Sequence, residues 1–162
     1  MLLKGSCHCG VVSFTVRSAH VHPYNLCYCS ICRKTAGAGG YAINLSGDYE
    51  TLQIQCQENI SVYRALITDE KTGEKTESHA QRSFCKTCGS GLWAWSPKWP
   101  ELVHPFASAI DSPLPAPPER THLMISSKAG WVELRSDPQD QLFEHYPEES
   151  IAEWHKRLGL ED

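Results

Sequence analysis

Seven of the eight cysteines lie in short clusters whose spacing suits metal binding. The clusters are Cys7 with Cys9, Cys27 with Cys29 and Cys32, and Cys85 with Cys88. Thiolate sulfurs one to three residues apart on glycine-rich turns can converge on one tetrahedral zinc ion at about 2.3 Å. A disulfide framework is disfavoured, because it is typical of small secreted chains and because residues separated by one position bridge each other with difficulty. The pattern therefore favours zinc.

The seven clustered cysteines divide into a set of four and a set of three. Four ligands close a structural zinc site, whereas three leave a position open for water or substrate. The segment from Cys27 to Cys32 supplies three thiolates, and the two remaining pairs must meet to hold one ion. Spacing alone also allows a second interpretation, in which every site is structural, as in zinc ribbons. The eighth cysteine, Cys56, alternates with Leu52 and Ile54, and we expect it to be a buried apolar side chain.

Longer segments around these cysteines carry a family resemblance. They are Gly5–Phe14 (GSCHCGVVSF), Cys27–Lys34 (CYCSICRK), Arg82–Leu92 (RSFCKTCGSGL) and, more weakly, Thr121–Met124 followed by Trp131. In this order they resemble the glutathione-dependent formaldehyde-activating (GFA) enzyme family, which includes centromere protein V. The resemblance covers about residues 2–146. One departure is Tyr28, where many relatives have histidine; it concerns the role of that side chain and not the metal site.

The resemblance implies a mainly β fold, a β-tent of antiparallel sheets stapled by zinc. It also implies two zinc ions per chain. A structural zinc would be held by Cys7, Cys9, Cys85 and Cys88, and a catalytic zinc by Cys27, Cys29 and Cys32. We expect a GFA-like zinc-binding domain over residues 1–146 and a helical extension over 147–162 packed on the same domain.

The activity that the resemblance implies is that of a carbon–sulfur lyase. Its substrate would be a hemithioacetal of glutathione or another small thiol, such as S-hydroxymethylglutathione. An open position on the second zinc would hold the thiol as a thiolate, ready to attack formaldehyde. We expect Arg33 to meet a glutathione carboxylate, with a solvated arginine as the alternative, and His122 to be the histidine at the site. A non-catalytic zinc-stabilised binding module and a thiol-handling enzyme with a different substrate remain alternatives.

Charge and hydropathy argue against several other classes of protein. The 15 basic and 19 acidic residues give a net charge of −4, which disfavours a protein whose main partner is nucleic-acid phosphate. The apolar runs are far shorter than the ~20 residues of a membrane helix, and no signal-peptide core follows Met1. We therefore expect a cytoplasmic protein with a small-molecule thiol partner and no nucleic acid or membrane. The oligomeric state stays open, with a homo-oligomer among the alternatives.

The elements that must position the cysteines are mostly strands. Alternating apolar and polar residues predict strands at 12–16, 41–45, 49–56, 60–67, 76–84, 91–95 and 102–110, most of them antiparallel. A hairpin turn is expected at 69–74, where charged residues and a glycine interrupt the pattern.

Helical signals occur at two places in the sequence, and a proline-rich connection lies between them. Ser30 is expected to cap a short helical turn that aims its amide groups at the neighbouring sulfurs and ends at Gly37–Gly40. Residues 111–121 hold four prolines and predict a surface connection. The apolar spacing over 150–158 predicts an amphipathic C-terminal helix, packed on the sheet or on a partner chain.

Overall fold

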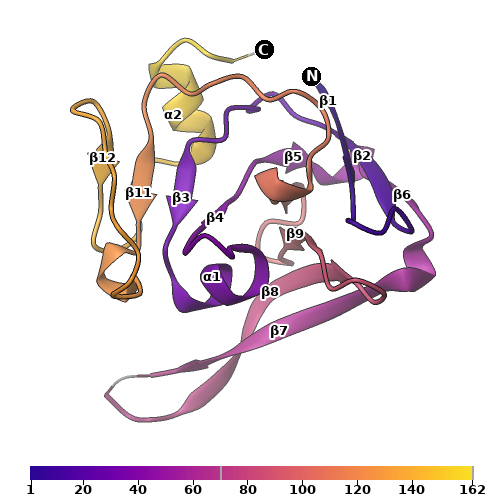
Figure 1. Ribbon diagram of the computed structural model, residues 1–162, viewed down its shortest axis with the longest axis horizontal. Helices are drawn as coiled ribbons and strands as arrows, with labels where there is room; N and C mark the ends of the chain where they lie inside the picture. The colour runs from indigo at the N-terminus through magenta and orange to yellow at the C-terminus, as the bar shows by residue number, and fades with distance from the viewer. Residues whose placement is uncertain (70, 162) are drawn as a thin grey trace.

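The computed structural model describes residues 1–69 and 71–161, and the strands within them form three sheets (Figure 1). The first sheet has the order β1 (Leu2–Ser6), β2 (Ser13–Arg17) and β6 (Gln53–Gln55). The second has the order β5 (Gly47–Asp48), β10 (Leu102–Pro105), β9 (Gly91–Trp95), β8 (Lys75–Cys85) and β7 (Ile60–Thr68). The third has the order β12 (Gln141–Leu142), β11 (Thr121–Leu123), β3 (Asn25–Cys27) and β4 (Ala42–Ile43). The helices are α1 (Ser30–Ala36) and α2 (Ile151–Arg157), with single 3-10 turns η1 (Tyr49–Thr51), η2 (Gln57–Asn59), η3 (Ala107–Ala109) and η4 (Ile125–Ser127).

The expectation of a mainly β fold with antiparallel sheets and a short C-terminal helix is confirmed, with one difference in the third sheet. All pairings in the first two sheets are antiparallel. In the third sheet β11 runs parallel to both β3 and β12. Parallel neighbours need a long crossover connection, and here nearly a hundred residues separate β3 from β11. The proline-rich segment 111–120 leads the chain into β11 as an irregular connection, as expected.

The main core lies where the first sheet packs on the five-stranded sheet. Phe14 and Val16 of β2 are buried on alternate positions, and the Phe14 ring meets Trp93 of β9 edge to face at 5.0 Å. Cys7 and Cys85 belong to the same buried cluster, at the end of this interface. The core therefore holds the turn after β1, which contains Cys7, against the end of β8, which contains Cys85.

The predicted hairpin turn is confirmed between β7 and β8, which form the long ribbon at the bottom of Figure 1. The N–H of Asp69 donates to Glu74 O at 2.9 Å, and the Asp69 carboxylate accepts the N–H groups of Lys71 and Thr72. Glu70 of the predicted turn lies outside the described residues. Gly73 has a φ of 72°, a left-handed conformation that a residue with a Cβ adopts at a cost.

The expectation for Cys56 is wrong, because the chain leaves the sheet at this residue. Strand β6 ends at Gln55, and Cys56 has a φ of 55° and starts the turn η2, which leaves its side chain exposed. The alternation over residues 49–56 thus extends beyond the strand, which occupies only Gln53–Gln55. The predicted strand at 102–110 likewise ends at Pro105 and gives way to η3.

Helix α2 packs on its own chain. Ser150 and Glu153 form a reciprocal capping box at its start, and the helix buries Trp154 completely. The Trp154 ring stacks on Tyr24 at 3.7 Å, and its Nε1 donates to Glu119 Oε1 at 3.2 Å. The boundary between a domain over 1–146 and an extension over 147–162 remains a prediction. No helix among the described residues has the length and apolar character needed to cross a bilayer.

Candidate metal centres

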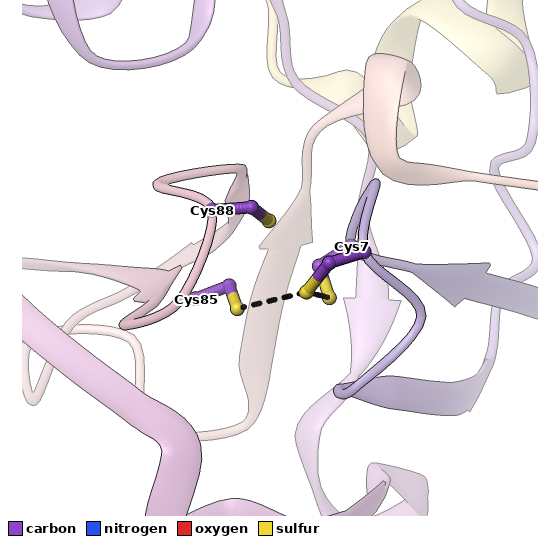
Figure 2. A group of neighbouring side chains, drawn as sticks. Cys7, Cys85 and Cys88 are labelled. Carbon is purple, nitrogen blue, oxygen red and sulfur yellow. Dashed lines mark hydrogen bonds between the residues drawn. The ribbon is translucent and has the colours of Figure 1, made fainter.

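The structure brings Cys7, Cys9, Cys85 and Cys88 together, and we call them the four-cysteine cluster. Their sulfurs all lie within 4.8 Å of one another, with 3.5 Å between Cys7 and Cys9 and 3.8 Å between Cys9 and Cys85. Four sulfurs placed tetrahedrally at about 2.3 Å from zinc would be about 3.8 Å apart, so this donor set fits the ion. Figure 2 shows Cys7 pointing toward Cys85 and Cys88 from the opposite side of the cluster.

Two similar turns supply these sulfurs. One follows β1, where the N–H of Gly10 donates to Cys7 O at 2.9 Å, and the other follows β8, where the N–H of Gly89 donates to Cys85 O at 2.9 Å. Both glycines have positive φ, 75° and 73°. Each turn can therefore fold back tightly enough to present both of its sulfurs on one side. The N–H of Val12 also donates to Cys7 Sγ at 3.2 Å.

Ser90 joins the two turns and was not singled out in the sequence. Its Oγ accepts the N–H of His8 at 3.1 Å and lies 3.2 Å from Cys88 Sγ. Hydrogen bonds from Ser90 lower the pKa of Cys88 to about 5. At Cys9 the N–H of Val11 works to lower the pKa, but the neighbouring sulfurs outweigh it and raise the pKa to about 12. Without a cation, therefore, only some of the four thiols favour the thiolate form.

The second set, Cys27, Cys29 and Cys32, is called the triplet here. Its three sulfurs lie within 4.8 Å of one another and all three side chains are buried. Cys27 ends β3, and Cys29 is the N-cap of α1, with its Sγ accepting the N–H of Cys32 at 3.3 Å. The helix is where the sequence predicts it, but the cap is Cys29 and not Ser30, which is the first helical residue.

The triplet sulfurs strongly shift one another's pKa values. Contacts with Cys27 and Cys32, helped by backbone N–H groups, lower the pKa of Cys29 to about 2. Contacts with Cys29 and Cys32, together with burial, raise the pKa of Cys27 far above its usual range. The three thiols by themselves therefore hold one negative charge readily and resist further ionisation. A divalent cation would remove this conflict, because it neutralises thiolates as it binds them.

Apolar side chains surround the triplet on several sides. Buried Leu123 and Ala42 pack against it, together with the half-buried side chains of Met124 and Phe143. These residues come from β11, β4 and the segment after β12, so three parts of the chain enclose the three sulfurs. Such an environment restricts water and strengthens electrostatic interactions at the sulfurs.

Two polar residues near the triplet, Arg82 and Tyr146, were not assigned a role from the sequence. Loss of hydration and then the charge of the three triplet sulfurs raise the pKa of Tyr146 to about 12, while Arg82 acts in the opposite direction. Tyr146 nevertheless keeps 71% of its surface exposed, so its hydroxyl is accessible to a molecule that enters the site. Arg82 was visible only as part of a motif, and Tyr146 gave no sequence signal.

His122 lies on the opposite face of the third sheet from the triplet sulfurs. It pairs with Leu26 across β11 and β3, and Leu123 pairs with Cys27, so alternation places the imidazole on the Tyr28 side. The Tyr28 hydroxyl is 2.8 Å from His122 Nδ1, and His122 Nε2 is 3.5 Å from Asp140 Oδ2. The second contact has ion-pair distance but lacks the geometry of a hydrogen bond. Binding of a small molecule by His122 stays a prediction.

Asp140 anchors the far end of this buried Tyr28–His122–Asp140 chain. Its two carboxylate oxygens accept the N–H groups of Arg120 at 2.8 Å and Asp137 at 2.9 Å. Burial works to raise the pKa of Asp140, but these N–H groups and His122 outweigh it and lower the pKa. Tyr28, the residue that departs from the GFA pattern, thus connects the triplet segment to the strand pair β11–β12. Arg33 is half-buried on α1, and its Nε is sealed from solvent with no hydrogen-bond partner among the described residues.

Comparison with known proteins agrees with the cysteine geometry. The family described as "Glutathione-dependent formaldehyde-activating enzyme" matches residues 2–127. A Halomonas elongata protein, provisionally named a glutathione-dependent formaldehyde-activating enzyme, is 60% identical over 162 residues, covering 100% of this chain and 99% of the relative. A crystal structure of a Rhodobacter sphaeroides protein aligns with a TM-score of 0.50 at 26% identity, over 69% of this chain and 91% of that chain. The chain therefore belongs to the glutathione-dependent formaldehyde-activating enzyme family.

Proposed function

We propose that the chain is a zinc-dependent carbon–sulfur lyase that forms and cleaves the hemithioacetal of formaldehyde with glutathione or another small thiol. The observation that carries this proposal is the division of seven cysteines into a closed set of four and a buried set of three. A tetrahedral ion with three protein sulfurs keeps one position for an exchangeable ligand. The family name supports glutathione as the thiol and formaldehyde as its partner.

The proposal includes two zinc ions per chain. The sulfur separations in both cysteine sets suit a tetrahedral, thiolate-preferring ion, and zinc matches that description. When bound at the triplet, zinc would supply a positive charge that lowers the pKa of a thiol placed beside it. The ion at the four-cysteine cluster would have no open position and would stabilise the fold.

The reaction requires little from the protein beyond binding and orienting the thiol and formaldehyde. The thiol sulfur forms a bond to the formaldehyde carbon, the carbonyl π electrons move to oxygen, and the thiol proton ends on that oxygen. The reverse step breaks the same carbon–sulfur bond, and no oxidant or reductant is needed. Met124 and Phe143 limit water around the sulfurs. We retain the prediction that Arg33 binds a glutathione carboxylate. His122 lies on the face opposite the triplet sulfurs, and its proposed role is to hold Tyr28, which belongs to the triplet segment.

We also propose that the protein acts in the cytoplasm on a small-molecule thiol, without nucleic acid or membrane partners. All eight cysteines are free in the structure, which suits a compartment that keeps thiols reduced. The net charge of −4 gives no electrostatic attraction to phosphate-rich or anionic surfaces.

A comparison of three cysteine variants tests the proposal. Zinc per chain is measured by native mass spectrometry on reduced protein with and without glutathione. Turnover is measured as exchange between labelled formaldehyde and its glutathione adduct by NMR. We expect two zinc ions and turnover in the parent protein. Cys29→Ser should keep its fold and one zinc but lose turnover, whereas Cys88→Ser should fail to fold.

Cys56→Ser is the matched control, because Cys56 is exposed and outside both sets. It should keep both zinc ions and full turnover. The proposal is refuted if Cys29→Ser unfolds as readily as Cys88→Ser, or if it retains turnover. A parent protein that holds one zinc and binds no glutathione would favour the non-catalytic binding module.

A further inference from the structure

Arg82 has two guanidinium nitrogens, Nε and Nη1, that are sealed from solvent and have no hydrogen-bond partner within the described residues. No described carboxylate forms an ion pair with it. A buried charged donor without an acceptor is costly, and proteins normally pair such groups. Arg82 therefore keeps buried N–H donors at which an anion from outside the chain would be stabilised.

The backbone of Arg82 is held on both sides by neighbouring strands of the five-stranded sheet. It lies on β8, paired with Tyr63 of β7 on one side and Ala94 of β9 on the other. Its positive charge favours the ionised forms of both Cys32 and Tyr146, so the guanidinium lies within electrostatic reach of the triplet. Gly91 of β9, which pairs with Phe84 of β8, lies against Thr35 and Ala36 of α1, the helix that carries Cys32.

Tyr146 approaches the triplet from the segment that follows β12. The N–H of Met124 donates to His145 O at 3.1 Å, and the N–H of Ile125 donates to Phe143 O at 3.2 Å. These bonds fix the segment against η4, while Phe143 itself packs on the triplet. The phenol that follows is exposed and neutral at physiological pH, so it can donate a hydrogen bond to a molecule entering the site.

The triplet sulfurs do not satisfy Arg82. Neither Nε nor Nη1 has a hydrogen bond to any of the three sulfurs, even though sulfur accepts at longer range than oxygen. With zinc bound, a three-thiolate site would carry a single net negative charge spread over the sulfurs, which suits a guanidinium fork less well than a carboxylate does. Arginine presents parallel N–H donors that match both oxygens of one carboxylate.

We propose that Arg82, assisted by Tyr146, binds a carboxylate of the thiol substrate. The site then selects thiols that carry a carboxylate over neutral thiols of the same size. This inference rests on the proposed function, because the triplet must hold the thiol sulfur while Arg82 holds its anionic end.

A pair of small thiols tests the selectivity without any variant. Mercaptoacetate and mercaptoethanol have similar size and differ in charge, and their binding to zinc-loaded protein is measured by calorimetry. We expect mercaptoacetate to bind at least about tenfold more tightly, as one charged hydrogen-bonding pair would provide. Equal affinities for the two thiols would overturn the inference.

Variants then assign the selectivity to Arg82. Arg82→Gln should weaken mercaptoacetate binding about ten- to hundredfold and leave mercaptoethanol binding unchanged. Arg82→Lys keeps the charge but loses the planar set of guanidinium donors. Its affinity for mercaptoacetate should lie between that of the parent and that of Arg82→Gln. Tyr146→Phe should reduce mercaptoacetate binding by a smaller factor. Arg135→Gln is the matched control, because Arg135 pairs with Glu133 at the surface, and it should match the parent.

The result separates this inference from the proposed function. Selective binding that depends on Arg82, without any formaldehyde adduct, would support the carboxylate site and refute the lyase. Turnover with a carboxylate preference that survives in Arg82→Gln would refute the carboxylate site and leave the lyase standing. Zinc per chain is measured on every variant, so that loss of the metal is not mistaken for loss of the anion contact.

Discussion

Replacing Tyr28 with phenylalanine should destabilise the protein by removing one buried hydroxyl. That hydroxyl lies 2.8 Å from His122 Nδ1, and both side chains are almost completely buried. The Asp140 carboxylate faces His122 Nε2, and we therefore assign the imidazole proton to Nε2 and the acceptor role to Nδ1, which receives the hydrogen bond from Tyr28. Tyr28→Phe leaves Nδ1 buried without a donor.

The expected loss in the free energy of unfolding is about 2 kcal/mol. Leaving one buried acceptor unsatisfied costs about 1–3 kcal/mol, and the cavity left by a single oxygen adds little. For a chain of this size that corresponds to a melting temperature lower by about 4–8 °C. Urea denaturation at fixed zinc concentration measures the loss, and the m-value should stay constant because the exposed surface hardly changes.

Tyr41→Phe is the control for this measurement. The Tyr41 ring lies 5.3 Å from that of Tyr28, but Tyr41 is only half-buried and its hydroxyl has no hydrogen bond to the described residues. We expect a change below about 0.5 kcal/mol. If the two variants are equally stable, Tyr28 does not connect the triplet segment to His122 in the way described. Under the proposed function, a third readout is the rate at which zinc bound at the triplet is lost to a chelator, and this rate should rise in Tyr28→Phe alone.

Three further predictions concern the fold. Trp154→Ala should lower the free energy of unfolding by about 3–5 kcal/mol, measured in urea, because it removes a fully buried ring stacked on Tyr24; a loss under about 1 kcal/mol would contradict the packing. Gly40→Ala should destabilise by about 2 kcal/mol, since φ is 104° and a Cβ would lie 2.3 Å from Val132, whereas Gly39→Ala, with open space around it, should be neutral in the same assay. Burial lowers the pKa of His155. His20 and His22 add to this effect, whereas the Ile151 carbonyl and Glu161 oppose it. The folded state therefore favours neutral His155, and stability should fall as pH drops from about 7 to about 5, by up to about 1.4 kcal/mol per pH unit. His155→Gln should flatten that slope, and an unchanged slope would show that His155 is not the group responsible.

The sequence was most informative where chemistry depends on local spacing. Both cysteine sets could be predicted, because ligands one to three residues apart must share a turn, and the count of seven leaves few divisions. The long strands β7 and β8 could be predicted from alternation, since each is long enough to show a period of two. The family resemblance, carried by the same motifs, is confirmed.

The rest depends on contacts between distant parts of the chain. Strands β1 and β3 were not predicted, because neither sequence, LLKGS or NLC, shows the alternation of apolar and polar residues that indicates a strand. Cys56 was predicted as buried because alternation does not reveal where a chain turns out of a sheet. Arg82, Tyr146 and Asp140 come from separate elements, and only the folded chain places them around the triplet or behind it.

The four-cysteine cluster has a consequence for the order in which metal can be acquired. Cys9 and Cys85 are 76 residues apart in sequence, and the triplet lies inside the loop that they close. A growing chain completes the triplet long before Cys88 leaves the ribosome. A metal ion that meets the nascent chain early can therefore bind only at the triplet or at the unpaired Cys7–Cys9 turn. Under the proposed roles, the structural site is the last to become available and the exchangeable site is the first.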